Sequence, residues 1–447
     1  MRLSPAYREL LAPERRWLLA AAGGASFVAA SDVLLIATAL PSAARDLGGL
    51  DRYALVVGCY AAALAVGLPI SGAIIDRFGA WHSLVFGCVL FAIAGLAAPF
   101  APSMEAIAGL RLLQGFAAGF LLAVPLSVVV QRIPTHLQRP AYALSNSVWA
   151  LAALAGPVLG AVLTDLLSWR AAFLVPVLLT GVVAYAGYRG LRDPSIRPAD
   201  PGARIHPLGP LLLGATVATL LLEPRFAVVP AIGFLLSEWR SPEPVFPRTR
   251  SGRAIAILCA SAGIAFTGAD GFVPLGLQVG LGWPILAAAI PLIGTTAAWA
   301  IGSFASARLR LGRRGQMLLA GAIVAGGVGV MAIPLLGGFT IAIGIVIAAF
   351  GMGIQSPVAL LGSAAERPSG EGRATASVPL ARSIGGGIGI ALAGALVVGS
   401  VGQRALTAAE DVRTGVPAIT AAVHHANLVL ALISLACLPA VLLLRRD

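Results

Sequence analysis

Long apolar runs separated by short polar segments dominate the pattern of the chain. In the first half they cover residues 17–40, 54–75, 81–100, 105–127, 143–165 and 170–190. In the second half they cover residues 252–275, 283–305, 316–336, 338–362, 374–400 and 424–444. Each run is close to the roughly 20 apolar residues that a helix needs to cross a bilayer. The pattern therefore predicts an all-α polytopic membrane protein built from two six-helix bundles.

The segment between the two sets has a different composition. Residues 191–207 are polar and rich in proline and cannot span a bilayer. Two short apolar runs follow, at 208–222 and 226–238, and a locally deformed bilayer accepts such short helices at modest cost. We expect two short helices here, either as a re-entrant hairpin or as two spans. The predicted domains are a first bundle at 1–190, a linker at 191–251 and a second bundle at 252–447.

Composition agrees with this class and excludes several others. Hydrophobic residues make up 58% of the 447 residues and charged residues 11%. All 31 basic residues are arginine, so a Walker A loop and a Schiff-base lysine are both excluded. The four cysteines and five histidines form no metal-binding spacing, and we expect no metal and no cofactor. The net charge of +12 is spread over loops, which argues against a nucleic-acid partner.

The distribution of arginine predicts the orientation. With the N-terminus inside and an even number of crossings in the linker, 23 arginines lie in inner segments, 6 in outer segments and 2 within spans. Cytoplasmic loops carry such an excess of basic residues. Both termini are therefore expected in the cytoplasm.

Asp32 is the first functional candidate, because it is the only acid in the apolar run 17–40. A carboxylate at this depth costs about 2.5–3.5 kcal/mol on insertion scales, and such residues usually face a cavity, a partner charge or a proton. The alternative is an acid that only hydrogen-bonds a neighbouring helix.

Three further residues are candidates for proton coupling or for lining the cavity next to the coupling residues. Arg111 lies in the fourth span at a depth compatible with a pair to Asp32, and Gln114 lies one turn further along the same face. We expect Arg111 to set the proton affinity of Asp32 or to respond to its protonation. Asp270 is a second acid near a helix end, either a second proton or cation site or an ordinary hydrated acid.

Several stretches resemble motifs of the major facilitator superfamily: GAIIDRFG at 72–79, LRLLQGFAAG around Arg111 and AGPVLGAVL at 155–163. The third is similar to a motif of its proton-driven exporters. SDVLLIATALP at 31–41 resembles the first-helix motif of the drug:proton antiporters, and ARSIGGGIGIA at 381–391 resembles a late-helix motif of their 14-helix branch. The chain departs from the pattern at Ala80-Trp81-His82, where a basic pair is usual.

The first of these stretches predicts a gate. Gly72, Asp76, Arg77 and Gly79 belong to a short inner loop, and an acid there can pair with arginines or a helix N-terminus in one conformation and release them in another. The alternative is a hydrated loop whose charges only fix the topology. A weak echo of this loop follows Gly302 in the second half.

The remaining candidates are expected to bend a helix or to line a cavity. Gly156, Pro157 and Gly160 predict a bend in the fifth span, where proline removes a backbone hydrogen bond; simple packing is the alternative. Arg382 is followed by several glycines and is expected to face a central cavity. Trp149 and Trp299 lie in spans and either line a cavity for an apolar substrate or merely pack.

Together these features predict a proton-coupled exporter that moves hydrophobic or amphipathic small molecules, cations among them, by alternating access. A lipid or metabolite exporter on the same fold is the alternative. A membrane enzyme would need an acid pair or metal cluster, which the sequence lacks. The resemblance implies a bacterial inner membrane, and we expect a monomer whose partners are protons, substrate and lipid.

Overall fold

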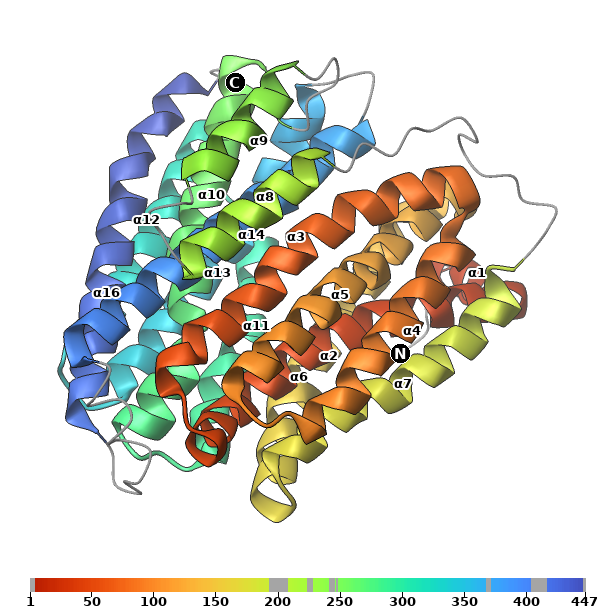
Figure 1. Cartoon of the computed structure of the whole chain (residues 1–447). Helices are drawn as coiled ribbons and strands as arrows, with labels where there is room; N and C mark the ends of the chain where they lie inside the picture. Colours follow the sequence, from red (N-terminus) through yellow and green to blue (C-terminus); the bar gives the residue numbers. More distant parts are fainter. Residues whose placement is uncertain are drawn as a thin grey trace.

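The computed structural model describes residues 5–192, 208–222, 228–240, 246, 248–366, 371–402 and 416–444. All regular secondary structure in these ranges is helical, and twelve helices are long and apolar enough to cross a membrane (Figure 1). The first half contains α1 (Pro5–Leu10), α2 (Arg16–Leu47), α3 (Tyr53–Phe78), α4 (Ala80–Ala97), α5 (Met104–Arg132), α6 (Thr135–Leu166) and α7 (Trp169–Gly190).

The linker and the second half follow the same plan. Two short helices come first, α8 (Leu208–Leu222) and α9 (Val228–Arg240). The second set comprises α10 (Arg250–Asp270), which continues into the π-helix η5 (Leu275–Gly280), α11 (Ile285–Ser306), α12 (Arg313–Met331), α13 (Phe339–Ala365), α14 (Glu371–Val401) and α16 (Pro417–Cys437), followed by the 3-10 helix η7 (Leu438–Leu443). The predicted fold class is confirmed.

Some helices extend beyond the predicted spans. The first span was expected to end at residue 40, but α2 continues through Pro41 to Leu47. Asp46 near its end accepts hydrogen bonds from Trp169 Nε1 at 2.9 Å and from Arg170 Nη1 at 2.7 Å. Similarly, α6 begins at Thr135, eight residues before the expected start. Charged and polar residues ended the predicted spans, whereas a helix continues wherever such side chains find partners or water.

The two halves repeat one packing scheme. In the first half α2 packs against α6 and α7, and α3 packs against α5. In the second half α10 packs against α14 and α16, and α11 packs against α13. Parallel six-helix repeats of this kind are a known plan for transporters.

The short pair lies at the junction of the halves. α8 contacts α3 of the first half and α14 of the second, and α9 packs against α8 (Figure 1). At about 1.5 Å per residue, these helices reach only about two thirds of the ~30 Å thickness of the hydrocarbon core. The domain boundaries 190 and 251 remain predictions.

The hydrophobic core consists of different clusters at the two ends of the helices. We call the end where α7 ends and α10 begins the linker side, and the opposite end the far side. On the far side one buried cluster joins both halves, with residues 35–44 of α2 and 262–279 of the second half among its members. On the linker side each half has its own cluster, one including residues 18–29 and the other residues 254–259. A small cluster of Ala65 on α3 and Leu380 on α14 also joins the halves near the middle of the helices. The halves therefore share a large core on the far side, whereas the two large clusters on the linker side are separate.

Polar contacts also join the halves on the far side. Arg45 Nη2 of α2 donates to the backbone oxygen of Gln278 at 2.9 Å, and Gln278 Nε2 donates to the backbone oxygen of Thr38 at 3.2 Å. The rings of Tyr53 and Phe272 lie 5.7 Å apart across the same junction. These contacts close the far side in this conformation.

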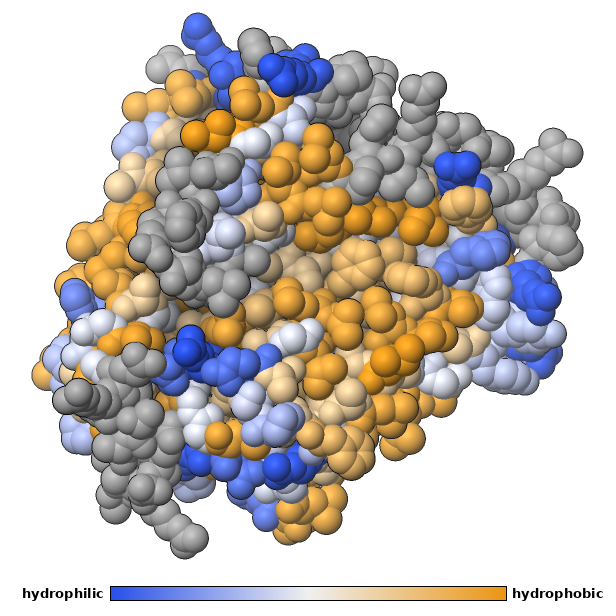
Figure 2. All heavy atoms as spheres, viewed as in Figure 1, coloured by the Kyte–Doolittle hydropathy of each residue, from blue (hydrophilic) through white to orange (hydrophobic). Residues whose placement is uncertain are grey.

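The outer surface fits a membrane environment. Figure 2 shows hydrophobic side chains over the middle of the visible face and hydrophilic ones gathered near the helix ends. Large apolar side chains such as Leu178, Ile301 and Leu361 are more than half exposed. Exposed apolar surface of this extent needs lipid or a partner to cover it.

Candidate functional site

A buried ion pair lies between α2 and α5. Arg111 Nη1 donates to Asp32 Oδ2 at 2.6 Å, and the two side chains are 6% and 0% exposed. The same nitrogen lies 3.2 Å from Gln114 Oε1, and the guanidinium carbon lies 4.1 Å from the centre of the Tyr60 ring. The pairing expected from the depths of Asp32 and Arg111 is therefore present.

The pair leaves several polar atoms without partners. Asp32 Oδ1, Arg111 Nε, Gln114 Nε2 and the Tyr60 hydroxyl are all buried and make no hydrogen bond within the described residues. An unsatisfied buried polar atom costs about 1–3 kcal/mol, so a cluster of four is unusual in a site with a purely structural role. In particular, Asp32 Oδ1 accepts no hydrogen bond within the described residues and can bind a proton.

α6 packs closely against the turn that carries Asp32. A Cβ atom at Gly156 would lie 3.3 Å from the backbone oxygen of Ser31, and one at Gly160 would lie 2.5 Å from that of Leu35. Pro157 is buried beside them. Glycine is therefore required at Gly160 for this approach of the two backbones. A bend at this point remains a prediction.

A second polar cluster lies in the other half. Arg382 Nη2 of α14 lies 3.4 Å from Gln355 Oε1 of α13, and its guanidinium carbon lies 5.6 Å from the centre of the Trp299 ring of α11. Gln355 Nε2 in turn donates to the backbone oxygen of Leu258 at 3.1 Å. Arg382 Nε is buried without a partner, and no described carboxylate pairs with this arginine.

Both clusters lie at the level where the core divides. Asp32 falls between Ala29 of the linker-side cluster and Leu35 of the shared cluster. In the second half, Gln355 falls between Met352 of the shared cluster and Ala359 of the linker-side cluster. The two polar sites thus occupy corresponding depths in the two halves.

Asp270 lies apart from both, at the end of α10 on the far side. Its Oδ1 atom and the hydroxyl of Tyr53 are both buried without partners among the described residues, and the two side chains are close enough to interact electrostatically. Asp270 is therefore a partly buried acid at the junction of the halves. A second proton or cation site there remains a prediction, and an ordinary hydrated acid remains the alternative.

The stretch predicted as a gate loop is mostly helical, which corrects the expectation: Gly72, Asp76 and Arg77 lie in the last two turns of α3, and Gly79 alone forms the tight turn to α4. The predicted span ends before these charges, but a helix end in contact with water accommodates them. Gly79 has φ +89°, a conformation that favours glycine, and its N–H bonds to the Ile75 oxygen at 2.8 Å. Arg77 is exposed and lies over the Phe78 ring at 5.1 Å. A Cβ atom at Gly72 would contact nothing within 4 Å. The Asp76 side chain lies outside the described residues.

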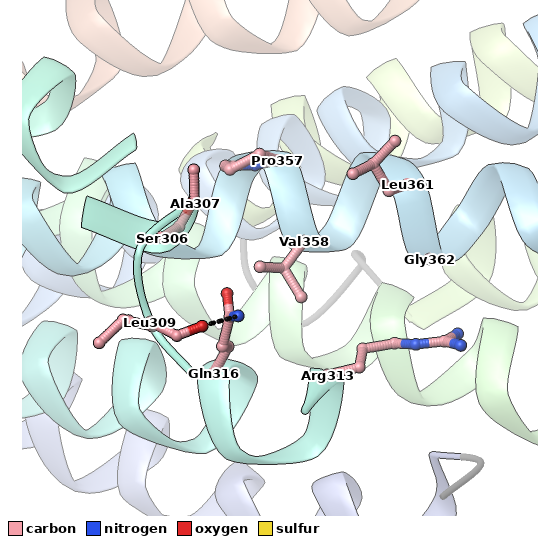
Figure 3. A pocket seen from close by; sticks show the side chains of 9 residues that line it. All are labelled: Ser306, Ala307, Leu309, Arg313, Gln316, Pro357, Val358, Leu361 and Gly362. Atoms are coloured by element: carbon pink, nitrogen blue, oxygen red, sulfur yellow. Dashed lines mark hydrogen bonds between the residues drawn. The ribbon is translucent and has the colours of Figure 1, made fainter. Parts of the chain in front are cut away.

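The corresponding region of the second half borders a cavity of about 440 Å³. Its lining comes from the ends of α11 and α13 and the start of α12, with Ser306, Arg313, Gln316 and Val358 among the contributors (Figure 3). Arg313 Nη1 lies 3.9 Å from Glu366 Oε1 on the same side. None of the residues of the two polar clusters lines this cavity, so it is separate from them.

Sequence reasoning missed Tyr60 and Gln355. An amide within an apolar span was a usable signal for Gln355, but nothing in the sequence says which face of its helix Tyr60 occupies. Trp299, expected to line a cavity or to pack, lies beside Arg382. Trp149, expected to line a cavity or to pack, is 42% exposed on α6. Its place in a cavity remains a prediction.

The sequence matches the family model described as Major Facilitator Superfamily over residues 22–390. The chain belongs to the major facilitator superfamily. Membership identifies a transporter of small molecules rather than an enzyme, and it agrees with the twelve membrane-length helices of the described residues. The finer assignment to a 14-helix branch remains a prediction.

The chain is also similar to named transporters and to a solved structure of the same fold. It is 28% identical to a probable multidrug-efflux transporter of Mycobacterium tuberculosis, over 88% of this chain and 89% of that protein. It is 26% identical to a probable actinorhodin transporter of Streptomyces coelicolor, over 89% and 75%. The crystal structure of a mutant of the peptide transporter POT in complex with alafosfalin has the same fold, with a TM-score of 0.69, 15% identity and coverage of 97% and 96%.

Proposed function

We propose that this transporter is a proton-coupled exporter of hydrophobic or amphipathic small molecules that works by alternating access. The observation that carries the proposal is the buried pair of Asp32 and Arg111, in which Asp32 Oδ1 has no partner among the described residues. Protonation of Asp32 weakens its attraction to Arg111, and a charge released in this way must find another partner. The pair is therefore a two-state element that a proton can switch.

The divided core supports the conformational part of the proposal. A large shared core on the far side, separate large clusters on the linker side and the small cluster of Ala65 with Leu380 between them fit one of the two end states of alternating access. With both termini in the cytoplasm of a bacterial inner membrane, as the arginine distribution favours, this state opens inward. Asp270 then belongs to the closed outer side and is a candidate for a second proton site.

The relatives support the direction of transport. Proteins named as multidrug-efflux transporters match nearly the whole chain, and export of apolar compounds fits a site that contains few charges. A lipid or metabolite exporter with the same coupling is the alternative. The superfamily fold serves both, so the substrate decides between them.

The test is uptake driven by a pH gradient in inside-out vesicles, with a panel of cationic, neutral and anionic amphipathic dyes. We expect the natural protein to accumulate at least one dye and Asp32→Asn to reduce accumulation to the level of empty vesicles. Asp165→Asn, which removes an exposed acid from α6, is the matched control and should transport normally. Size-exclusion profiles establish that all three proteins are folded.

Two outcomes would count against the proposal. Accumulation that is the same with and without the gradient would exclude proton coupling. If no dye moves but an added lipid or metabolite dissipates the gradient in an Asp32-dependent way, the coupling stands and the alternative substrate class replaces the first.

A further inference from the structure

Arg382 carries a positive charge that the described part of the protein does not neutralise. Its only polar side-chain contact there is a long one, 3.4 Å to the neutral amide oxygen of Gln355, and its Nε atom is buried without a partner. A cation at membrane depth is usually paired with an acid or faces a pathway. The described residues supply no such acid, so the arginine has donor capacity left for something outside the protein.

The surroundings of Arg382 provide an apolar wall for a ligand. Trp299 lies beside the guanidinium at 5.6 Å, and Phe266 of α10 meets the Trp299 ring edge-on, with ring centres 5.7 Å apart. Arg382, Trp299 and Phe266 are all partly exposed. The cluster therefore combines aromatic faces with a cation on a surface that is not sealed by packing.

The cluster lies near the middle of the helices, close to the edge of the large shared core. Arg382 follows Ala381 of the linker-side cluster, and Ile390 about two turns further along α14 already belongs to the shared core. The cluster thus lies near the level where the large shared core gives way to the separate linker-side clusters, and Leu380 and Ile384 on α14 pack there with Ala65 of α3. Glycines keep α14 close to α10 at this level, since a Cβ at Gly385 would overlap the Ala260 oxygen. The backbone of α14 next to Arg382 is therefore held against α10.

From this geometry we propose that Arg382 and Trp299 form the substrate subsite for an anionic group, so that the transporter accepts amphipathic molecules with an aromatic or apolar body and one carboxylate, sulfonate or phosphate group. Guanidinium offers paired N–H donors that match such groups, and the ring of Trp299 offers a face for the apolar body. The inference rests on the proposed function in that it names the class of its substrate.

The experiment is equilibrium binding of three fluorescent probes with the same body and different charge: 1-pyrenebutyrate, 1-pyrenebutanol and 4-(1-pyrenyl)butyltrimethylammonium. The protein is held in nanodiscs of phosphatidylcholine. We expect the natural protein to bind pyrenebutyrate about tenfold or more tightly than the cationic probe, as for other hydrogen bonds between charged groups. Arg382→Gln should abolish this preference and leave the affinity for pyrenebutanol unchanged.

A second variant guards against misfolding of the first. Gln355→Glu keeps Arg382 but gives it a carboxylate partner like that of Arg111, and should also abolish the preference for the anion. Arg308→Gln removes an exposed arginine of the same half and is the matched control, with the preference intact. A natural protein that prefers the cationic probe, or a preference that survives in both Arg382→Gln and Gln355→Glu, would overturn the proposal.

A lipid headgroup offers the same chemistry as an anionic substrate, and one further arm separates them. Phosphatidylglycerol is added to the nanodiscs and retained lipid is measured by native mass spectrometry. Pyrenebutyrate binding that persists in phosphatidylglycerol supports a small-molecule subsite. If phosphatidylglycerol displaces the probe and is itself lost from Arg382→Gln, the site holds lipid and the proposal is wrong. Because binding needs no gradient, failure of proton coupling would leave these results unchanged.

Discussion

Arg111 of α5 and Arg382 of α14 are deep arginines at corresponding levels of the two halves, and their surroundings differ. Arg111 is 6% exposed and lies 2.6 Å from a fully buried carboxylate, with Tyr60 over its guanidinium. Arg382 is partly exposed, contacts only the amide of Gln355 among the described polar side chains, and has Trp299 beside it at a greater distance. Among the described residues, the repeated fold therefore carries a cation paired with a carboxylate in one half and a cation without such a partner in the other.

The difference in charge partners implies different roles for Arg111 and Arg382. A closed ion pair responds to a proton, because protonation removes one of its charges. An open cation responds to an anion arriving from outside. Packing does not distinguish the halves in the same way, since α2 with α6 and α10 with α14 both rely on glycine at the point of closest approach. The asymmetry lies in the charges.

The largest expected effect separates the two arginines by stability. Arg111→Gln leaves the buried carboxylate of Asp32 without its partner, and loss of one member of a buried pair costs about 3–5 kcal/mol. Arg382→Gln removes a charge that has no described acidic partner and should leave stability unchanged or raise it. Thermal unfolding of the purified proteins in one detergent measures both.

The double variant sharpens this comparison. Asp32→Asn with Arg111→Gln removes both charges together and should recover most of the stability that Arg111→Gln loses. Equal losses for Arg111→Gln and Arg382→Gln would mean that Arg382 has a partner of its own, and the proposed asymmetry would be abandoned.

The second effect tests whether packing is the same in the two halves. Gly160→Ala places a Cβ 2.5 Å from the Leu35 oxygen, and Gly385→Ala places one in overlap with the Ala260 oxygen. Both should destabilise by about 1–3 kcal/mol, the usual cost of overpacking. Gly181→Ala and Gly326→Ala, where a Cβ meets nothing within 4 Å, are the controls and should unfold at the natural temperature. A loss at only one of the two packed glycines would show that the helix pairs are not equivalent.

The third effect concerns the side from which Arg382 can be reached. Arg45→Ala removes the donor to the Gln278 oxygen, and a hydrogen bond from a charged group contributes about 1.5–3 kcal/mol. We expect the far side to open more often, by about tenfold or more. Labelling of Cys59, buried in the shared core, by a membrane-impermeant maleimide measures this in a protein with the other three cysteines replaced by serine. Labelling that is as slow as without the substitution would mean that apolar packing alone closes the far side.

The sequence was sufficient for the twelve spans, and it showed that the depths of Asp32 and Arg111 allow the pair that the structure contains. Apolar runs form helices in lipid because every backbone N–H and C=O group there needs a hydrogen-bond partner. Opposite charges at the same membrane depth tend to pair. The sequence did not predict the continuation of α2 to Leu47, which depends on Trp169 and Arg170 far along the chain. It also could not predict the division of the core, because the same residues serve both states of a transporter and the pattern does not select one.

The smallest expected effect distinguishes the two aromatic neighbours. Cation–π contacts contribute about 0.5–2 kcal/mol according to their burial. Tyr60→Leu removes the ring over Arg111 and should lower stability within that range, without changing the affinity for pyrenebutyrate. Trp299→Leu should instead weaken pyrenebutyrate binding about threefold and change stability little, because the ring acts on a ligand that is absent from the free protein. Trp299→Phe keeps an aromatic face and should restore part of the affinity. If both leucine variants affect stability alone, Trp299 belongs to the packing of α11 and Arg382 binds anions without it.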